Sequence, residues 1–229
     1  HTIDKKKQAD VYSLRFLNFQ KVLCLSPHPD DVEVGMMGSV IKHKDTHFDV
    51  LCLTKGGAKG FDNTNQQDRR GEVNNVWGDV NINNISVLHS KYDYFEDTNE
   101  PGWINYIEND FIKKNNYDCI FIPTTDDSMF EHRFVHKFGS ALCRFSLISL
   151  IEYHAFSTLN TWQPNFFVSV KKEYKDKLKA LNLFKSQSNK SYFKKPTLDS
   201  FHSNFQCSKK GIKVVEQFKI IELFGGVNK

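Results

Sequence analysis

The sequence predicts an α/β protein with a Rossmann-like, mainly parallel twisted sheet and helices on both faces. We expect a single domain over residues 1–229 with a C-terminal extension, since 229 residues suit one domain of this class. Short apolar runs alternate with amphipathic helical segments through the first two thirds of the chain, which is typical of right-handed βαβ units. No internal repeat, low-complexity stretch or linker divides the sequence.

The first half of the chain supplies four apolar runs that read as buried strands, with helical segments between them. The helical segments show apolar residues at helical spacing, as in Val34, Met37 and Ile41. A glycine-rich loop at 55–60 follows the second strand and is either a plain connector or a substrate-facing loop. The expected strands are 21–25, 48–54, 85–88 and 117–123, and the expected helices are 33–44, 67–77 and 103–114.

The second half continues the alternation less regularly. We expect helices at 134–150 and 171–185 and strands at 151–157, 165–170 and 213–224. Two polar segments, 89–102 and 188–210, are the candidate specificity elements, because long loops within a compact domain are often functional.

Composition and charge exclude some classes of function. Hydrophobic residues make up 39% and charged residues 25%, which is ordinary for a globular protein. The net charge of +4 is diffuse, and no Arg/Lys stripe with interleaved aromatics appears, so we expect no nucleic-acid partner. The positive charge mildly favours anionic substrates such as phosphorylated sugars.

The cysteines and the apolar segments indicate a cellular setting. There are five cysteines, an odd number, and no pair has C-x-x-C spacing, so we expect buried reduced thiols and a reducing compartment. No apolar run approaches the ~20 residues of a membrane span. The first residues lack the apolar segment of a signal peptide. These features predict a cytoplasmic protein without a membrane span.

The most informative stretch is the end of the first strand. The apolar run 22–25 leads directly into His28, Asp30 and Asp31, and prolines 27 and 29 fix the backbone on both sides of the histidine. Buried ionisable groups need a partner, and a divalent cation is the simplest one. A turn whose carboxylates cap the next helix is the alternative.

A second polar cluster follows the strand at 117–123 and contains Asp126, Asp127, Glu131 and His132. If both strands lie near the centre of one parallel sheet, their carboxyl ends share a crevice. Two histidines and one aspartate with an open position describe a catalytic zinc site. A neighbouring carboxylate that does not bind the metal can take a proton from the metal-bound water.

These motifs resemble those of a known family. Residues 26–35, SPHPDDVEVG, followed by Gly38 and Ser39, look like the opening signature of the PIG-L/LmbE-like deacetylases. That family contains zinc-dependent enzymes that remove acetyl groups from N-acetylglucosamine-type substrates. Further matches occur in the family's order over nearly the whole chain, at residues 53–56, 69–72, 121–123, 127–133, 177–187 and 216–218.

The resemblance implies a role for each matching residue. Zinc, as one divalent ion, would be bound by His28, Asp31 and His132, and Asp30 matches the general base. Arg69 matches the arginine that contacts the sugar or phosphate side of the substrate. Glu72 would orient Arg69, although an ordinary i,i+3 helix pair is the alternative reading.

The sequence departs from the family at two positions of the second cluster. Many relatives carry a histidine where this chain has Met129, and that histidine assists the tetrahedral oxyanion. A methionine cannot donate a hydrogen bond, so Met129 marks a substrate-binding position that lacks this helper. Glu131 stands where an aspartate is usual. His136, one helical turn after His132, is a candidate replacement donor; His154 and His202 are weaker ones.

The resemblance therefore implies a zinc-dependent hydrolase that removes the acetyl group from an N-acetylated amino sugar. The sugar could be nucleotide- or lipid-linked, or an intermediate of a natural product. The alternatives are a sugar-binding or regulatory protein that has lost turnover, which Met129 favours, and a zinc hydrolase of a different amide or ester. We expect a small-molecule partner, and the surplus of aromatic residues hints at a homo-oligomer.

Overall fold

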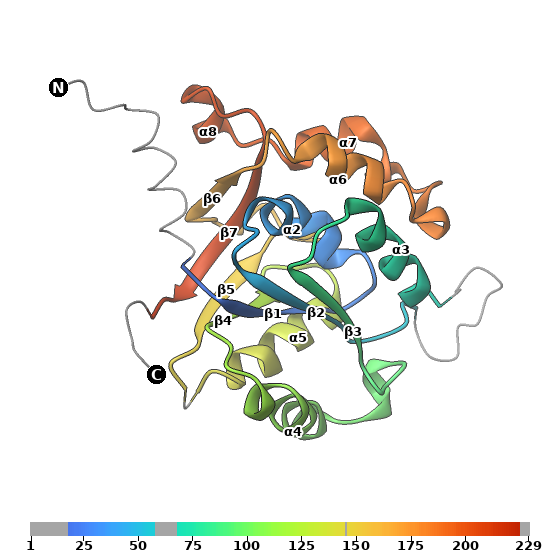
Figure 1. The fold of residues 1–229 in the computed structure, drawn as a ribbon, viewed down its shortest axis with the longest axis vertical. Coiled ribbons are helices and arrows are strands. Elements are labelled where there is room, and N and C mark those ends of the chain that lie inside the picture. The colour runs from blue at the N-terminus through green and yellow to red at the C-terminus, as the bar shows by residue number, and fades with distance from the viewer. Residues whose placement is uncertain (1–17, 58–67, 145, 225–229) are drawn as a thin grey trace.

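The protein is built on one seven-stranded sheet (Figure 1). This computed structural model describes residues 18–57, 68–144 and 146–224. The strand order is β3-β2-β1-β4-β5-β7-β6. The strands are β1 (Lys21–Ser26), β2 (His47–Cys52), β3 (Ile85–His89), β4 (Cys119–Pro123), β5 (Ser149–Tyr153), β6 (Phe166–Ser169) and β7 (Val215–Glu222).

The first five strands are parallel, and β7 pairs antiparallel with both β5 and β6. The predicted mainly parallel α/β sheet is therefore confirmed. The order of β1 and β4 matters most, because these central strands are direct neighbours and their carboxyl ends open at the same edge.

Helices cover both faces of the sheet (Figure 1). Side chains along β1 alternate between two cores: Val22 and Cys24 face one, and Leu23 and Leu25 face the other. The first core packs against α2, α3, α6 and α7, and the second against α4 and α5. The helices are α2 (Asp31–Lys42), α3 (Arg70–Val80), α4 (Glu100–Asp110), α5 (Phe130–Ala141), α6 (Tyr174–Leu181), α7 (Lys195–Phe201) and α8 (Phe205–Lys209).

Several element boundaries differ from the prediction. The helix expected at 134–150 is α5, which ends at Ala141, and β5 begins at Ser149 instead of at residue 151. The run from Ser149 to Tyr153 is buried throughout, and an apolar run of this kind cannot be assigned to helix or strand by periodicity. Helices α7 and α8 occupy the polar segment 188–210, where no element was expected.

Some expectations lie partly or wholly outside the described residues: the glycine-rich loop is described only as far as Gly57, and the expected helix at 67–77 begins one residue before the description resumes. All five cysteines are free and buried, as expected for reduced thiols. Within the described part of the chain, no helix is long and apolar enough to cross a membrane.

Candidate metal centre

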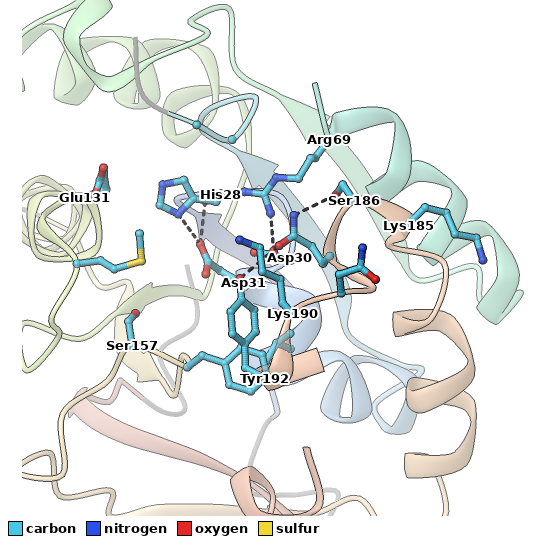
Figure 2. A pocket seen from close by; sticks show the side chains of 17 residues that line it. His28, Asp30, Asp31, Arg69, Glu131, Ser157, Lys185, Ser186, Lys190 and Tyr192 are labelled. Carbon is cyan, nitrogen blue, oxygen red and sulfur yellow. Dashed lines mark hydrogen bonds and ion pairs between the residues drawn. The ribbon is translucent and has the colours of Figure 1, made fainter. Parts of the chain in front are cut away.

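The two polar clusters meet at the carboxyl ends of β1 and β4. His28 lies in the turn between β1 and α2, and Asp31 is the first residue of α2. His132 lies in the first turn of α5, which follows β4. One ligand atom from each of these three residues lies within 4.8 Å of the other two. His28 and Asp31 line a cavity of about 850 Å³ (Figure 2), and Asp31 Oδ2 lies 3.3 Å from Nε2 of His132. The predicted convergence of two imidazoles and one carboxylate is present in the structure.

Hydrogen bonds hold the turn after β1 in shape. The hydroxyl of Ser26 donates to the carbonyl of His28 at 2.7 Å, and the backbone N–H of His28 donates to Asp31 Oδ2 at 2.8 Å. Thr54, two residues after β2, donates to the carbonyl of Pro27 at 2.9 Å. The neighbouring strand thus fixes the turn, and the side chains of His28 and Asp31 are oriented before any ligand binds.

His132 is oriented by a buried carboxylate. Its Nδ1 lies 3.0 Å from Asp127 Oδ2 and 3.3 Å from the hydroxyl of Ser157. Its Nε2 faces Asp31 Oδ2 at 3.3 Å but has no hydrogen-bond partner among the described residues, although the side chain is only 1% exposed. A carboxylate on one nitrogen and a free second nitrogen are typical of metal-binding histidines.

The buried Nε2 of His132, which has no hydrogen-bond partner among the described residues, shows that the three residues fit a cation. Burial alone would lower the pKa of His132, but Asp31 and Asp127 outweigh it and raise the pKa to about 10. The site therefore attracts positive charge at His132, which a proton or a divalent cation can supply. Two nitrogens and one carboxylate oxygen suit Zn²⁺, with a further position open to water or substrate.

Asp30 is not one of the three grouped residues and pairs with Arg69 instead. It precedes α2 with a φ of 132°, which an L-residue rarely adopts, and such backbone strain gathers at functional sites. Its Oδ2 accepts a hydrogen bond from Arg69 Nη1 at 2.5 Å, and both side chains are about 15% exposed or less. Burial raises the pKa of Asp30 to about 6, although Arg69 opposes the change.

Arg69 borders the pocket and passes directly over Gly56, which has a φ of 82°. A Cβ at Gly56 would lie 2.5 Å from Arg69 Nε, so this loop needs glycine for both space and conformation. In this structure Arg69 is paired with Asp30, and its expected contact with substrate stays a prediction.

Glu72 has a different partner from the one expected. Its two oxygens accept hydrogen bonds from Ser186, one from the backbone N–H at 2.9 Å and one from the hydroxyl at 2.5 Å. It therefore joins α3 to the segment 185–192, which forms one wall of the cavity. Within that wall, Tyr192 donates to the side chain of Gln187 at 3.3 Å.

On the opposite side of the cavity lie Glu131 and Ser157 (Figure 2), and Met129 also lines the cavity. Met129 is 39% exposed and brings a thioether to the position where a hydrogen-bond donor is missing. His136 does not replace that donor: its Nε2 lies 2.9 Å from Glu152, and it is not among the described residues that line the cavity.

The two weaker histidine candidates are also excluded as donors. His154 is stacked between Phe201 and Trp162, with ring centroids 4.2 and 5.2 Å away. His202 is 1% exposed and lies 2.7 Å from the ammonium group of Lys177. Neither histidine is among the described residues that line the cavity.

Comparison with known proteins decides the family. The family model described as PIG-L, GlcNAc-PI de-N-acetylase, matches residues 23–143. The chain belongs to the PIG-L family. The expected resemblance is thereby confirmed, and the matched stretch contains every proposed ligand as well as Asp30, Arg69 and Glu72.

Relatives of the PIG-L family member described here include deacetylases. A diacetylchitobiose deacetylase from Thermococcus kodakarensis is 46% identical over 43 residues, which is 18% of this chain and only 16% of that protein. The structure of N,N'-diacetylchitobiose deacetylase from Pyrococcus horikoshii is similar with a TM-score of 0.69 at 23% identity, covering 97% of this chain and 95% of that one.

More distant structures show that the fold alone does not determine the reaction. The A40926 pseudoaglycone deacetylase Dbv21 has a TM-score of 0.66 at 13% identity, over 90% of this chain and 98% of that one. GalB from Pseudomonas putida, a 4-carboxy-2-hydroxymuconate hydratase, has a TM-score of 0.68 at 13% identity, covering 92% of this chain and 98% of that one. The chemistry of this PIG-L family member must therefore be argued from its own site.

Sequence reasoning did not assign a role to two residues of the site. Asp127 belonged to the second polar cluster, and its position five residues before His132 was the available signal. Ser157 follows β5, and nothing in its sequence neighbourhood connects it to His132. Only the packing of β5 beside β4 brings its hydroxyl to the imidazole.

Proposed function

We propose that this protein is a zinc-dependent deacetylase that hydrolyses the acetamide of an N-acetylated amino sugar. One observation carries the proposal: the free Nε2 of His132 converges with His28 and Asp31, and these two residues line a cavity together with Asp30. Membership of a de-N-acetylase family supports the reaction class. The deacetylase activity of the chitobiose relatives supports a sugar substrate.

The proposed ligands are His28, Asp31 and His132. When bound there, zinc would lower the pKa of a coordinated water towards ~7 and polarise the acetyl carbonyl. Asp127 would keep the proton of His132 on Nδ1, so that Nε2 remains free to coordinate.

Asp30 is the proposed general base. Its carboxylate would accept the proton of the attacking water and later deliver it to the leaving amine. A base works best when its pKa lies near the operating pH, and burial moves Asp30 in that direction. Arg69 holds the carboxylate in place by the hydrogen bond to Oδ2. Met129 would contact the substrate without donating a hydrogen bond.

The test combines zinc analysis with acetate release from a panel of N-acetylglucosamine derivatives. The wild-type protein should bind one zinc per chain and release acetate from at least one substrate. The Asp30→Asn variant should keep its zinc and lose acetate release by about 100-fold or more. A protein that binds no zinc, or an Asp30→Asn variant with full activity, would contradict the proposal.

A second candidate function is binding of an N-acetyl sugar without turnover. Met129 favours it, because losing one oxyanion donor costs about 3 kcal/mol of transition-state stabilisation. Zinc binding and sugar affinity without acetate release, over the whole panel, would support this alternative.

A further inference from the structure

A buried ion pair lies beside α2, outside the candidate metal centre. It joins Lys177 of α6 to Glu216 of β7 at 2.6 Å, and both side chains are 0% exposed. His202, directly after α7, completes the cluster at 2.7 Å from Lys177 Nζ. None of the three is among the described residues that line the cavity. The proposed reaction therefore gives these charged groups no direct task.

The hydrogen bonds of this cluster are complete. The ammonium group of Lys177 donates to Glu216 Oε1, to His202 Nε2 and to the carbonyl of Val34. His202 Nδ1 lies 2.8 Å from the carbonyl of Leu198, so Nδ1 carries the proton and Nε2 accepts. Burial and Lys177 both lower the pKa of His202, which keeps it neutral. The cluster thus holds one positive and one negative charge.

The ion pair attaches to the middle of a helix. Glu216 accepts hydrogen bonds from the backbone N–H groups of Gly38 at 2.8 Å and Ser39 at 2.6 Å, and Lys177 donates to the carbonyl of Val34 at 2.5 Å. Backbone groups inside a helix ordinarily bond within the helix itself. Glycine makes the approach possible, since a Cβ at position 38 would lie 3.0 Å from Glu216 Oε1.

Val34 connects the ion pair to Asp30, the proposed base, through two backbone hydrogen bonds. The N–H of Val34 donates to the carbonyl of Asp30 at 2.9 Å, while the carbonyl of Val34 accepts from Lys177. Asp30 has the strained φ of 132°, and strain of this kind persists only where the surroundings enforce it. Val34 also borders the cavity. Lys177 of the buried pair therefore fixes the backbone of Val34, and Val34 in turn hydrogen-bonds to the backbone of Asp30.

A gain in stability is a weak explanation for such a pair. Removing two charges from water is costly, and well-packed apolar side chains of similar volume are often as stable or more stable. A fully hydrogen-bonded buried network instead favours one arrangement of the elements that it joins. Here those elements are α2, which begins with Asp31, and the C-terminal elements α6 and β7.

We propose that Lys177 and Glu216 are positioning residues, which fix α2 so that Asp30 and Asp31 hold their geometry at the metal centre. The inference rests on the proposed function for the identity of the metal. It concerns zinc affinity, which can be measured without any substrate.

The test measures zinc affinity by competition with a chromophoric chelator. The double variant Lys177→Met/Glu216→Gln removes both charges together, so neither is left buried alone. We expect its zinc affinity to fall by about 10- to 100-fold, the usual effect of losing a residue that supports a metal ligand. Lys179→Met is the matched control: Lys179 lies on the same helix, pairs with Asp79 at 2.9 Å and is 70% exposed, so zinc affinity should not change.

A second measurement needs only the wild-type protein. Coupling between two sites is reciprocal, so zinc should slow amide hydrogen exchange in peptides from α6 and β7 as well as in the metal-binding turn. Zinc affinity of the double variant within about threefold of wild type would overturn the positioning role, as would unchanged exchange in α6 and β7. A wild-type protein that binds no zinc would overturn the proposed function, and with it this role.

Discussion

Asp127 offers a sharp test of the candidate metal centre, because it contacts the proposed ligand His132 and would not touch the metal itself. Its Oδ2 accepts from His132 Nδ1 at 3.0 Å, and its Oδ1 accepts from the backbone N–H of Met129 at 2.8 Å. The Asp127 side chain is 0% exposed. Asp127→Asn keeps the shape of the side chain but replaces one acceptor oxygen with an N–H donor.

Either orientation of the new amide places a donor against a donor. If its nitrogen faces His132, the imidazole must move its proton to Nε2, which is the nitrogen proposed to bind the metal. If its nitrogen faces Met129, the partly buried backbone N–H of Met129 loses its acceptor. We expect zinc affinity to fall by about 10- to 100-fold, which corresponds to about 1.4–2.7 kcal/mol.

The assay is a competition titration against a chromophoric chelator, with acetate release measured at saturating zinc. Ser157→Ala is the matched control, because Ser157 contacts the same nitrogen at the longer distance of 3.3 Å, and its loss should weaken zinc binding less. Equal zinc affinities for wild type and Asp127→Asn would refute the assignment of His132 Nε2 as a ligand atom.

Three further outcomes are expected. Glu72→Gln should raise KM more than it lowers kcat in steady-state kinetics, because Glu72 holds Ser186 in the cavity wall. Gly35→Ala should lower the free energy of unfolding in urea by about 1–3 kcal/mol, since the added Cβ would lie 2.7 Å from the carbonyl oxygen of His154. Gly78→Ala is the control: a Cβ added at Gly78 would meet no atom within 4 Å, so this variant should stabilise α3 slightly. Chelation should abolish acetate release, and added zinc should restore it.

The parallel part of the fold could be predicted because each buried strand stands between amphipathic helices. From β1 to β4, hydrophobic periodicity distinguishes the apolar strands from the amphipathic helices. After α5 the same reasoning found a strand but misplaced its bounds: the strand was expected at 151–157 and lies at Ser149–Tyr153, because the helix before it was expected to continue to residue 150. The helices in the segment 188–210 were missed for another reason. Helices α7 and α8 are seven and five residues long, which is too short for a periodic signal.

The grouping of the three candidate ligands could be predicted because these residues follow two strand ends. His28 and Asp31 are close in sequence, and the pairing of β1 with β4 brings His132 to them. The partner of Glu72 could not be predicted, because Ser186 is 114 residues away in the sequence. For the same reason the contact of His136 with Glu152 was invisible, since it depends on how α5 lies over β5.

Two adjacent aspartates are needed because the proposed reaction requires one carboxylate to bind the metal and another to accept a proton. Burial raises the pKa of both carboxyls, but at Asp31 the imidazoles of His132 and His28 outweigh burial and lower it. At Asp30 burial outweighs Arg69 and raises the pKa to about 6. A carboxylate that coordinates a cation has its pKa lowered further, so one group cannot serve as both ligand and base. Asp30, which has the strained positive φ, pairs with Arg69, whereas Asp31 faces His28 and His132, so the two carboxylates have different partners.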